Sequence, residues 1–113
     1  QRDIKERTKE FAVLVVKFTI ELKKQGVEYP LRDQFLRSGT SIGANVKEAK
    51  ASSTRKELIR FYEIALRSAD ETEYWMEVIK CGYEMSEDGF RPIQTELKEI
   101  TRIIAKIVIN LKK

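Results

Sequence analysis

The side chains best suited to bind a partner lie in one polar stretch of the chain, between positions 38 and 52. Hydroxyl, amide and carboxylate groups recur there at steps of three and four residues, which places them on one face of a helix. They belong to Ser38, Ser41, Asn45, Glu48 and Ser52. The pattern indicates either a surface that docks another protein or a polar layer between helices, in which Asn45 fixes the register at some cost in stability.

A row of cations near the end of the chain suggests a second kind of chemistry. Lys98, Arg102 and Lys106 are spaced by four, and residues 91–113 hold six basic and two acidic residues, whereas residues 1–90 hold sixteen of each. Clustered cations bind phosphate backbones and release counterions, so the row predicts a nucleic-acid footprint. Its members are Arg91, Lys98, Arg102, Lys106, Lys112 and Lys113. A solvated helix face is the alternative.

The residues that catalysis requires are scarce. The chain has no histidine, which removes the commonest metal ligand and general base, and its one cysteine, Cys81, is expected to be a small apolar filler. Carboxylates do cluster, at Asp70, Glu71, Glu73 and Glu77, with Glu48 and Glu63 as further candidates. Known two-metal bundles pair such carboxylates with histidine, so we interpret the cluster as a charged helix face, with Mg²⁺ or Ca²⁺ binding as the alternative. We predict no enzyme activity, no cofactor and no metal.

Four segments with helical periodicity must position these groups. The first covers residues 3–25 and is followed by Gly26, where a left-handed helix cap is expected. The second opens with Pro30, which suits the first turn of a helix. Gly39 and Gly43 lie inside it and each costs roughly 1 kcal/mol against alanine. They predict a close approach of another backbone, which we favour, or a kink.

The third segment begins with a capping box, because Thr54 is followed three residues later by Glu57, and it ends at Gly82. A turn at residues 86–89 leads into the fourth segment, which has Pro92 in its first turn. Apolar residues then recur at alternating steps of four and three, which is typical of helices packed at a shallow angle. They are Leu58, Tyr62, Ala65, Ala69, Thr72, Met76 and Ile79 in the third segment and Ile93, Leu97, Ile100, Ile104, Ile107 and Leu111 in the fourth.

These patterns predict an all-α fold, an antiparallel up-down-up-down four-helix bundle with residues 1–113 as one domain. Some apolar residues exceed what one packed face requires, namely Val13, Val16, Ile20, Ile103 and Ile109. A monomer would leave their apolar area exposed, so we expect a homo-oligomer. The longest apolar run, residues 11–16, is too short to cross a bilayer, and no secretion leader is evident. A cytoplasmic protein without membrane insertion is therefore expected.

Two stretches resemble a known family. Residues 34–49 contain the run from Ser41 to Asn45, and residues 61–75 end in Glu-Thr-Glu-Tyr-Trp. Both are similar to bacterial four-helix bundle proteins found in intervening sequences of 23S ribosomal RNA genes. The resemblance implies a homo-oligomer, typically a ring of five, with no established enzyme activity.

A similar group of bundles serves as accessory factors for diversity-generating retroelements, where a basic pentamer contacts nucleic acid and the reverse transcriptase. The resemblance thus implies RNA or DNA binding, with a reverse transcriptase as a protein partner. By position, Ser41, Asn45, Glu48, Glu71 and Trp75 match the family pattern. Together with Ser38 they form the predicted polar layer or partner face. Lys47 and Ser68 depart from the pattern, which puts a shared polar site in doubt.

Overall fold

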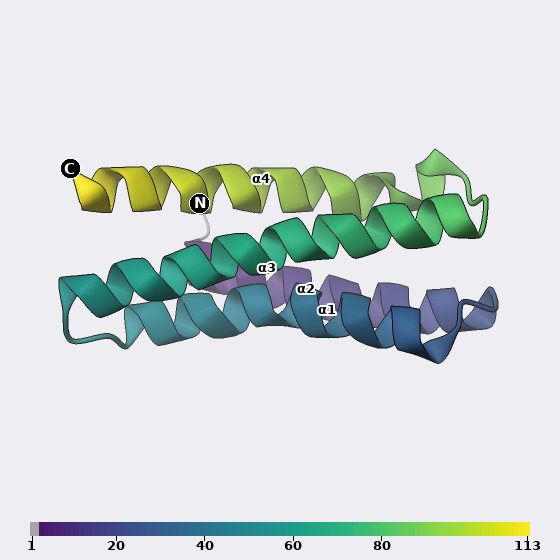
Figure 1. Cartoon of the computed structure of the whole chain (residues 1–113), viewed down its shortest axis with the longest axis horizontal. Helices are drawn as coiled ribbons and strands as arrows, with labels where there is room; N and C mark the ends of the chain where they lie inside the picture. The colour runs from purple at the N-terminus through teal and green to yellow at the C-terminus, as the bar shows by residue number, and fades with distance from the viewer. Residues whose placement is uncertain (1–2) are drawn as a thin grey trace.

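Four α-helices account for almost all of residues 3–113, the part of the chain that this computed structural model describes (Figure 1). They are α1 (Ile4–Lys24), α2 (Tyr29–Lys50), α3 (Arg55–Gly82) and α4 (Glu87–Lys112). Successive helices run in opposite directions along a body of 44 × 22 × 22 Å. The predicted all-α, up-down-up-down four-helix bundle is confirmed.

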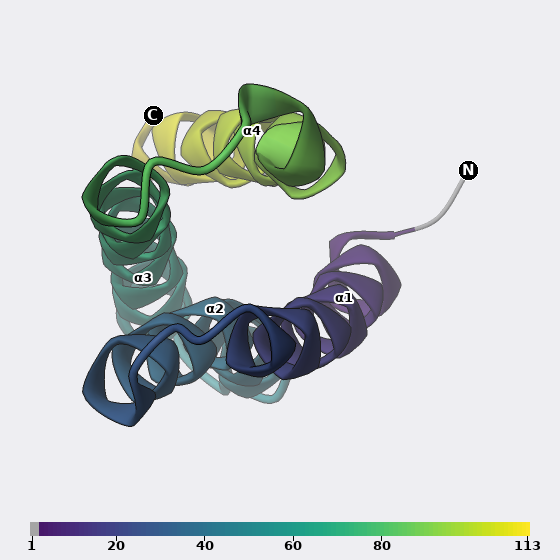
Figure 2. The same ribbon diagram turned by 90° about the vertical axis from the view of Figure 1, so that its right-hand side faces the viewer.

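The helices follow one another around the bundle axis, as the end-on view in Figure 2 shows. Helix α2 packs against both α1 and α3, whereas α1 and α4 make the weakest contact of the neighbouring pairs. An ion pair links that last pair: the Arg7 guanidinium donates to both carboxylate oxygens of Glu96, at 2.8 and 3.1 Å. Because both side chains are largely shielded from water, this forked contact holds α1 beside α4 more firmly than an exposed pair would.

The predicted helix ends agree closely with the structure. The Asp3 carboxylate caps α1 by accepting from the Glu6 backbone N–H at 2.9 Å, and the Thr54 hydroxyl caps α3 by accepting from the Glu57 N–H at 3.1 Å. Each bond satisfies a backbone donor that a helix start leaves free. After α1, Gly26 has φ +85°, the left-handed conformation that glycine adopts without a Cβ penalty.

Helix α4 begins earlier than predicted. Residues 87–89 belong to the helix, and Ser86 is its cap, with its hydroxyl accepting from the Asp88 N–H at 3.2 Å. Two carboxylates in the first turn favour this start because they face the positive end of the helix dipole. Pro92 consequently lies inside α4, so its predicted place in the first turn is wrong. Lacking an N–H, Pro92 cannot donate the helical bond to the fourth preceding carbonyl.

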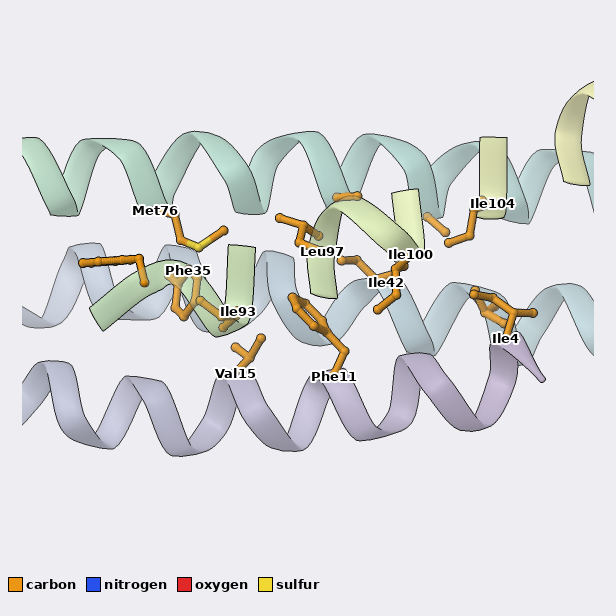
Figure 3. Packing of buried hydrophobic residues seen from close by; sticks show 14 of the residues in the cluster. Ile4, Phe11, Val15, Phe35, Ile42, Met76, Ile93, Leu97, Ile100 and Ile104 are labelled. Carbon is orange, nitrogen blue, oxygen red and sulfur yellow. The ribbon is translucent and has the colours of Figure 1, made fainter. Parts of the chain in front are cut away.

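The predicted apolar positions form one core between the four helices (Figure 3). Phe11 and Val15 of α1 meet Phe35 and Ile42 of α2, and Met76, Ile93, Ile100 and Ile104 complete the cluster from α3 and α4. One prediction was wrong at the end of α4, where Val108 is buried and Ile107 is only half-buried. A rigid four-three rhythm drifts against the 3.6-residue period of a straight helix, so the buried position moves by one residue.

Close packing against α1 explains the two glycines within α2, which is helical throughout. A Cβ at Gly39 would lie 2.8 Å from both methyl groups of Val15. A Cβ at Gly43 would lie 3.0 Å from the backbone oxygen of Thr8. The favoured interpretation, close approach of another backbone, therefore holds at Gly43, whereas at Gly39 the neighbour is the Val15 side chain.

Most of the predicted apolar surplus stays exposed. Val13, Val16 and Ile20 are 47%, 44% and 54% exposed on α1, and Ile109 is 60% exposed on α4. Ile103 differs, because it is half-buried and packs against the core. Within residues 3–113, no helix is both long and apolar enough to span a membrane.

Candidate functional site

A small hydrogen-bonded polar layer joins α2 to α3. The Ser68 hydroxyl donates to the Ser41 hydroxyl oxygen at 3.0 Å. The Asn45 amide donates to the same oxygen at 3.0 Å and to the Ser41 carbonyl at 2.8 Å. Below them, the Thr72 hydroxyl donates to the Ser68 carbonyl at 2.7 Å. The layer thus joins polar groups of two helices, and its members satisfy one another.

Ser68 completes this layer, although its residue type departs from the family pattern. Its side chain is buried between the helices. A signal was available, because Ser68 lies three residues after Ala65 and four before Thr72, which are both seam positions. Ala65, Ser68 and Thr72 thus form a second series at steps of three and four, and this series faces α2. The predicted seam of α3 includes Ala65 and Thr72 but passes through Ala69 instead of Ser68.

The six residues of the predicted polar layer or partner face have different environments. Ser38 is buried and donates to the Phe35 carbonyl at 3.2 Å, while Ser41 and Asn45 are half-buried. Glu48 and Glu71 are exposed beside the layer. The structure thus places a satisfied polar layer inside and free carboxylates outside, on neighbouring faces of α2 and α3.

Trp75 is the remaining member of that set, and its indole carries an unusual feature. The ring is half-buried and contacts Tyr74 edge-on, with ring centroids 5.0 Å apart and an interplanar angle of 75°. Its Nε1 is shielded from water and has no hydrogen-bond acceptor among residues 3–113. Leaving such a donor unpaired costs about 1–3 kcal/mol.

The six predicted phosphate-binding cations are all exposed, but the structure divides them. Three pair with carboxylates: Arg91 with Asp88 at 2.6 Å, Arg102 with Glu99, and Lys112 with Glu63 at 2.6 Å. Within the described chain, Lys98, Lys106 and Lys113 have no carboxylate within ion-pair distance. Exposed ion pairs are weak and readily exchanged, so a phosphate can still compete for the paired cations.

Carboxylates of α3 face the first half of the cation row. A groove of about 220 Å³ between α3 and α4 is lined by Asp70 and Glu73 on one side and by Lys98 and Arg102 on the other. Nearer the α3–α4 turn, the Lys80 ammonium contacts Glu77 at 2.8 Å and Glu87 at 2.6 Å. The hydrogen bonds that Lys80 donates to Glu77 and to Glu87 raise the pKa of Lys80, and the same contact lowers the pKa of Glu87. Carboxylates therefore offset the positive charge of the row in this half.

The carboxylate cluster of α3 does not assemble a metal centre in the described structure. Among residues 3–113, no group of three or more cysteine and carboxylate side chains is arranged to hold a metal ion. Cys81 is exposed, so its predicted role as an apolar filler was wrong. It lies one residue before the end of α3 and two residues after the buried Ile79, on a side of the helix that faces solvent.

Comparison with known proteins agrees with this architecture. The family model described as 23S rRNA-intervening sequence protein matches residues 1–106. A crystal structure of a protein of unknown function from the S23 ribosomal protein family of Bacteroides thetaiotaomicron is 35% identical, with a TM-score of 0.88 over 94% of this chain and 98% of that one. None of the curated proteins matches the chain. The family match and the shared four-helix architecture establish that this chain belongs to the 23S rRNA-intervening sequence protein family.

Proposed function

We propose that this protein is a non-catalytic, oligomeric bundle that associates with RNA or DNA. The observation that carries the proposal is the row of exposed cations on α4, in which Lys98, Lys106 and Lys113 have no carboxylate partner within the described chain. Free cations on a rigid helix bind phosphates without first giving up an ion pair. A reverse transcriptase of a diversity-generating retroelement would be one protein partner for such a nucleic-acid-bound scaffold.

Binding to a labelled duplex and to a single strand tests this proposal. We expect the wild-type protein to bind at about 50 mM salt and to lose at least tenfold in affinity by about 200 mM, because each phosphate contact releases counterions. A mobility-shift or anisotropy titration measures both affinities. No binding to any RNA or DNA at the lower salt would refute the proposal.

Self-association is the second part of the proposal, and the exposed aliphatic strip on α1 supports it. The strip consists of Val13, Val16 and Ile20, which follow one another along the outer face of the helix. Covering such a strip removes apolar area from water at about 25 cal/mol per Å². A second copy of the chain is the partner we propose, and a ring would repeat the α4 cations and raise the avidity for a polyanion.

Charged substitutions in the strip should separate the copies. We expect Val16→Glu and Ile20→Glu together to weaken association by about 3 kcal/mol or more, over a hundredfold in Kd, because burying two carboxylates is costly. Light scattering should shift from a multiple of the 13.2 kDa chain mass to the mass of one chain. Thr95→Glu, at an exposed position of α4, is the control. A wild-type mass of one chain would contradict the prediction.

The alternative function is a protein-interaction module that uses the Ser41, Asn45 and Glu48 face without nucleic acid. One observation favours it, namely that the shielded Trp75 Nε1 has no acceptor among residues 3–113, since a rotation of the half-buried ring would let a docked protein supply one. Capture of a host protein that Glu48→Lys abolishes, in a chain that binds neither RNA nor DNA, would support this alternative over the first.

A further inference from the structure

Charge is distributed very unevenly along the bundle. The connection between α2 and α3 and the C-terminus of α4 lie at the same end (Figure 1). A hydrogen bond joins them there, because the Arg55 guanidinium at the start of α3 donates to the Leu111 carbonyl near the end of α4. We call this region the basic end and define it as residues 47–63 and 106–113.

The basic end holds more positive charge than the whole chain. It contains eight cations and three carboxylates, a net charge of +5, against +4 for all 113 residues. Its cations are Lys47, Lys50, Arg55, Lys56, Arg60, Lys106, Lys112 and Lys113. Residues 70–99, around the α3–α4 turn, contain three cations and nine carboxylates, a net charge of −6. The sign of the charge therefore changes along α4, between its first and second halves.

These cations are available to a partner. All eight are exposed, and among them only Lys112 has a carboxylate within ion-pair distance in the described chain. Arg60 lies over the Phe61 ring, 5.4 Å from its centroid, and keeps its guanidinium at the surface. The Asp3 carboxylate interacts electrostatically with Lys50, and this single negative charge offsets only part of the positive charge of the basic end. Exposed cationic side chains from three helices thus give one end of the molecule a positive potential that few carboxylates offset.

The basic end lacks platforms for base stacking. Its two aromatic residues are Phe61, which is half-buried, and Tyr62, which is buried. The aromatic side chains that are exposed in residues 3–113, Tyr29 and Tyr74, belong to other parts of the bundle. Single-strand binders combine cations with exposed aromatic rings, whereas cations alone contact the backbone and carry no base information.

We propose that the basic end binds the phosphate backbone of a nucleic-acid duplex, independently of base sequence. This inference rests on the proposed nucleic-acid association and changes its location. It excludes Arg91, Lys98 and Arg102, and it adds five cations from the end of α2 and the start of α3. A duplex carries one phosphate charge per about 1.7 Å of its axis, about twice the density of one strand. Across a face 22 Å wide, a duplex therefore offers this cluster about twice as many contacts.

Two triple variants with the same loss of charge test the location. Lys50→Gln, Lys56→Gln and Lys106→Gln take one unpaired cation from each of α2, α3 and α4 at the basic end. The control, Lys17→Gln, Lys23→Gln and Lys24→Gln, removes three exposed cations of α1 far from it. We expect the first variant to lose about tenfold or more in duplex affinity at 50 mM salt and to lower the salt slope by about 0.9 per lost contact. The control should bind like the wild type.

Each outcome decides between explanations, with circular dichroism used to confirm that both variants keep their helices. Equal losses in both variants would mean that net charge alone drives binding and would overturn the location. A wild type that prefers the single strand, or one duplex sequence over another, would overturn the duplex assignment. Binding to vesicles that contain anionic lipid, without binding to duplex, would assign the basic end to a membrane surface and refute the inference. No wild-type binding to any nucleic acid would refute the proposed function as well.

Discussion

Replacing Phe35 with alanine is expected to lower the free energy of unfolding by about 3–5 kcal/mol. The side chain is fully buried at the centre of the core and meets the edge of Phe18, with ring centroids 5.9 Å apart. Phe18 in turn contacts Phe90 of α4 at 5.0 Å, so Phe35 supports an aromatic cluster that links three helices. Since a domain of this size has a total stability of about 5–15 kcal/mol, the loss is a large fraction of it.

Chemical denaturation followed by circular dichroism measures this loss. Tyr29→Ala is the matched control, because it removes an aromatic ring from the same helix at a position that is 64% exposed. We expect the control to change the unfolding free energy by no more than about 0.5 kcal/mol. Equal effects of the two substitutions would show that the core is not packed around Phe35.

Alanine at Gly39 is expected to destabilise the bundle by about 1–3 kcal/mol, even though alanine favours a helix over glycine by about 1 kcal/mol. The added Cβ would lie 2.8 Å from both methyl groups of Val15, which is itself fully buried and cannot move aside into solvent. The steric cost therefore exceeds the gain in helix propensity. Gly43→Ala should act in the same direction, because its Cβ would press against the Thr8 backbone.

Thermal and chemical unfolding of single and double variants test this explanation. Val15→Ala makes room for the new methyl group, so in the double variant the cost of Gly39→Ala should largely disappear. Gly89→Ala is the control, because a Cβ there meets no atom within 4 Å and should leave stability unchanged or raise it by up to about 1 kcal/mol. If Gly39→Ala were neutral and showed no coupling to Val15, α1 and α2 would not be in close contact there.

Helix ends are set by local interactions. They were therefore predicted correctly where one local signal acts alone and incorrectly at the start of α4, where two compete. A cap such as Thr54 acts on a backbone N–H three residues away, and Gly26 acts through its own φ angle, so both can be recognised from a few neighbouring residues. At the start of α4 two local signals compete. Pro92 favours a late start, but Ser86 caps an earlier one and two carboxylates stabilise it, and the weight of these effects could not be judged from position alone.

The candidate sites were predicted less well because they are made by pairs of helices. Periodicity places Ser41 and Asn45 on one face of α2, but it does not reveal that Ser68 of α3 lies 3.0 Å from the Ser41 hydroxyl. The same limit applies to the cation row. Its spacing along α4 was correct, yet Asp70 and Glu73 of α3 face its first half, and that contact depends on how α3 and α4 pack.

By itself, therefore, the sequence determined the four helices, the caps at Thr54 and Gly26 and most residues of the core, because these follow from backbone geometry and from the burial of apolar groups spaced 3.6 residues apart. Only the tertiary structure decided where the charge gathers. Antiparallel packing brings the end of α2, the start of α3 and the end of α4 to the same end of the bundle, although 56 positions separate Lys50 of α2 from Lys106 of α4. The electrostatic potential at a point is the sum of contributions from all nearby charges. Each contribution depends on the distance in space and not on the separation along the chain.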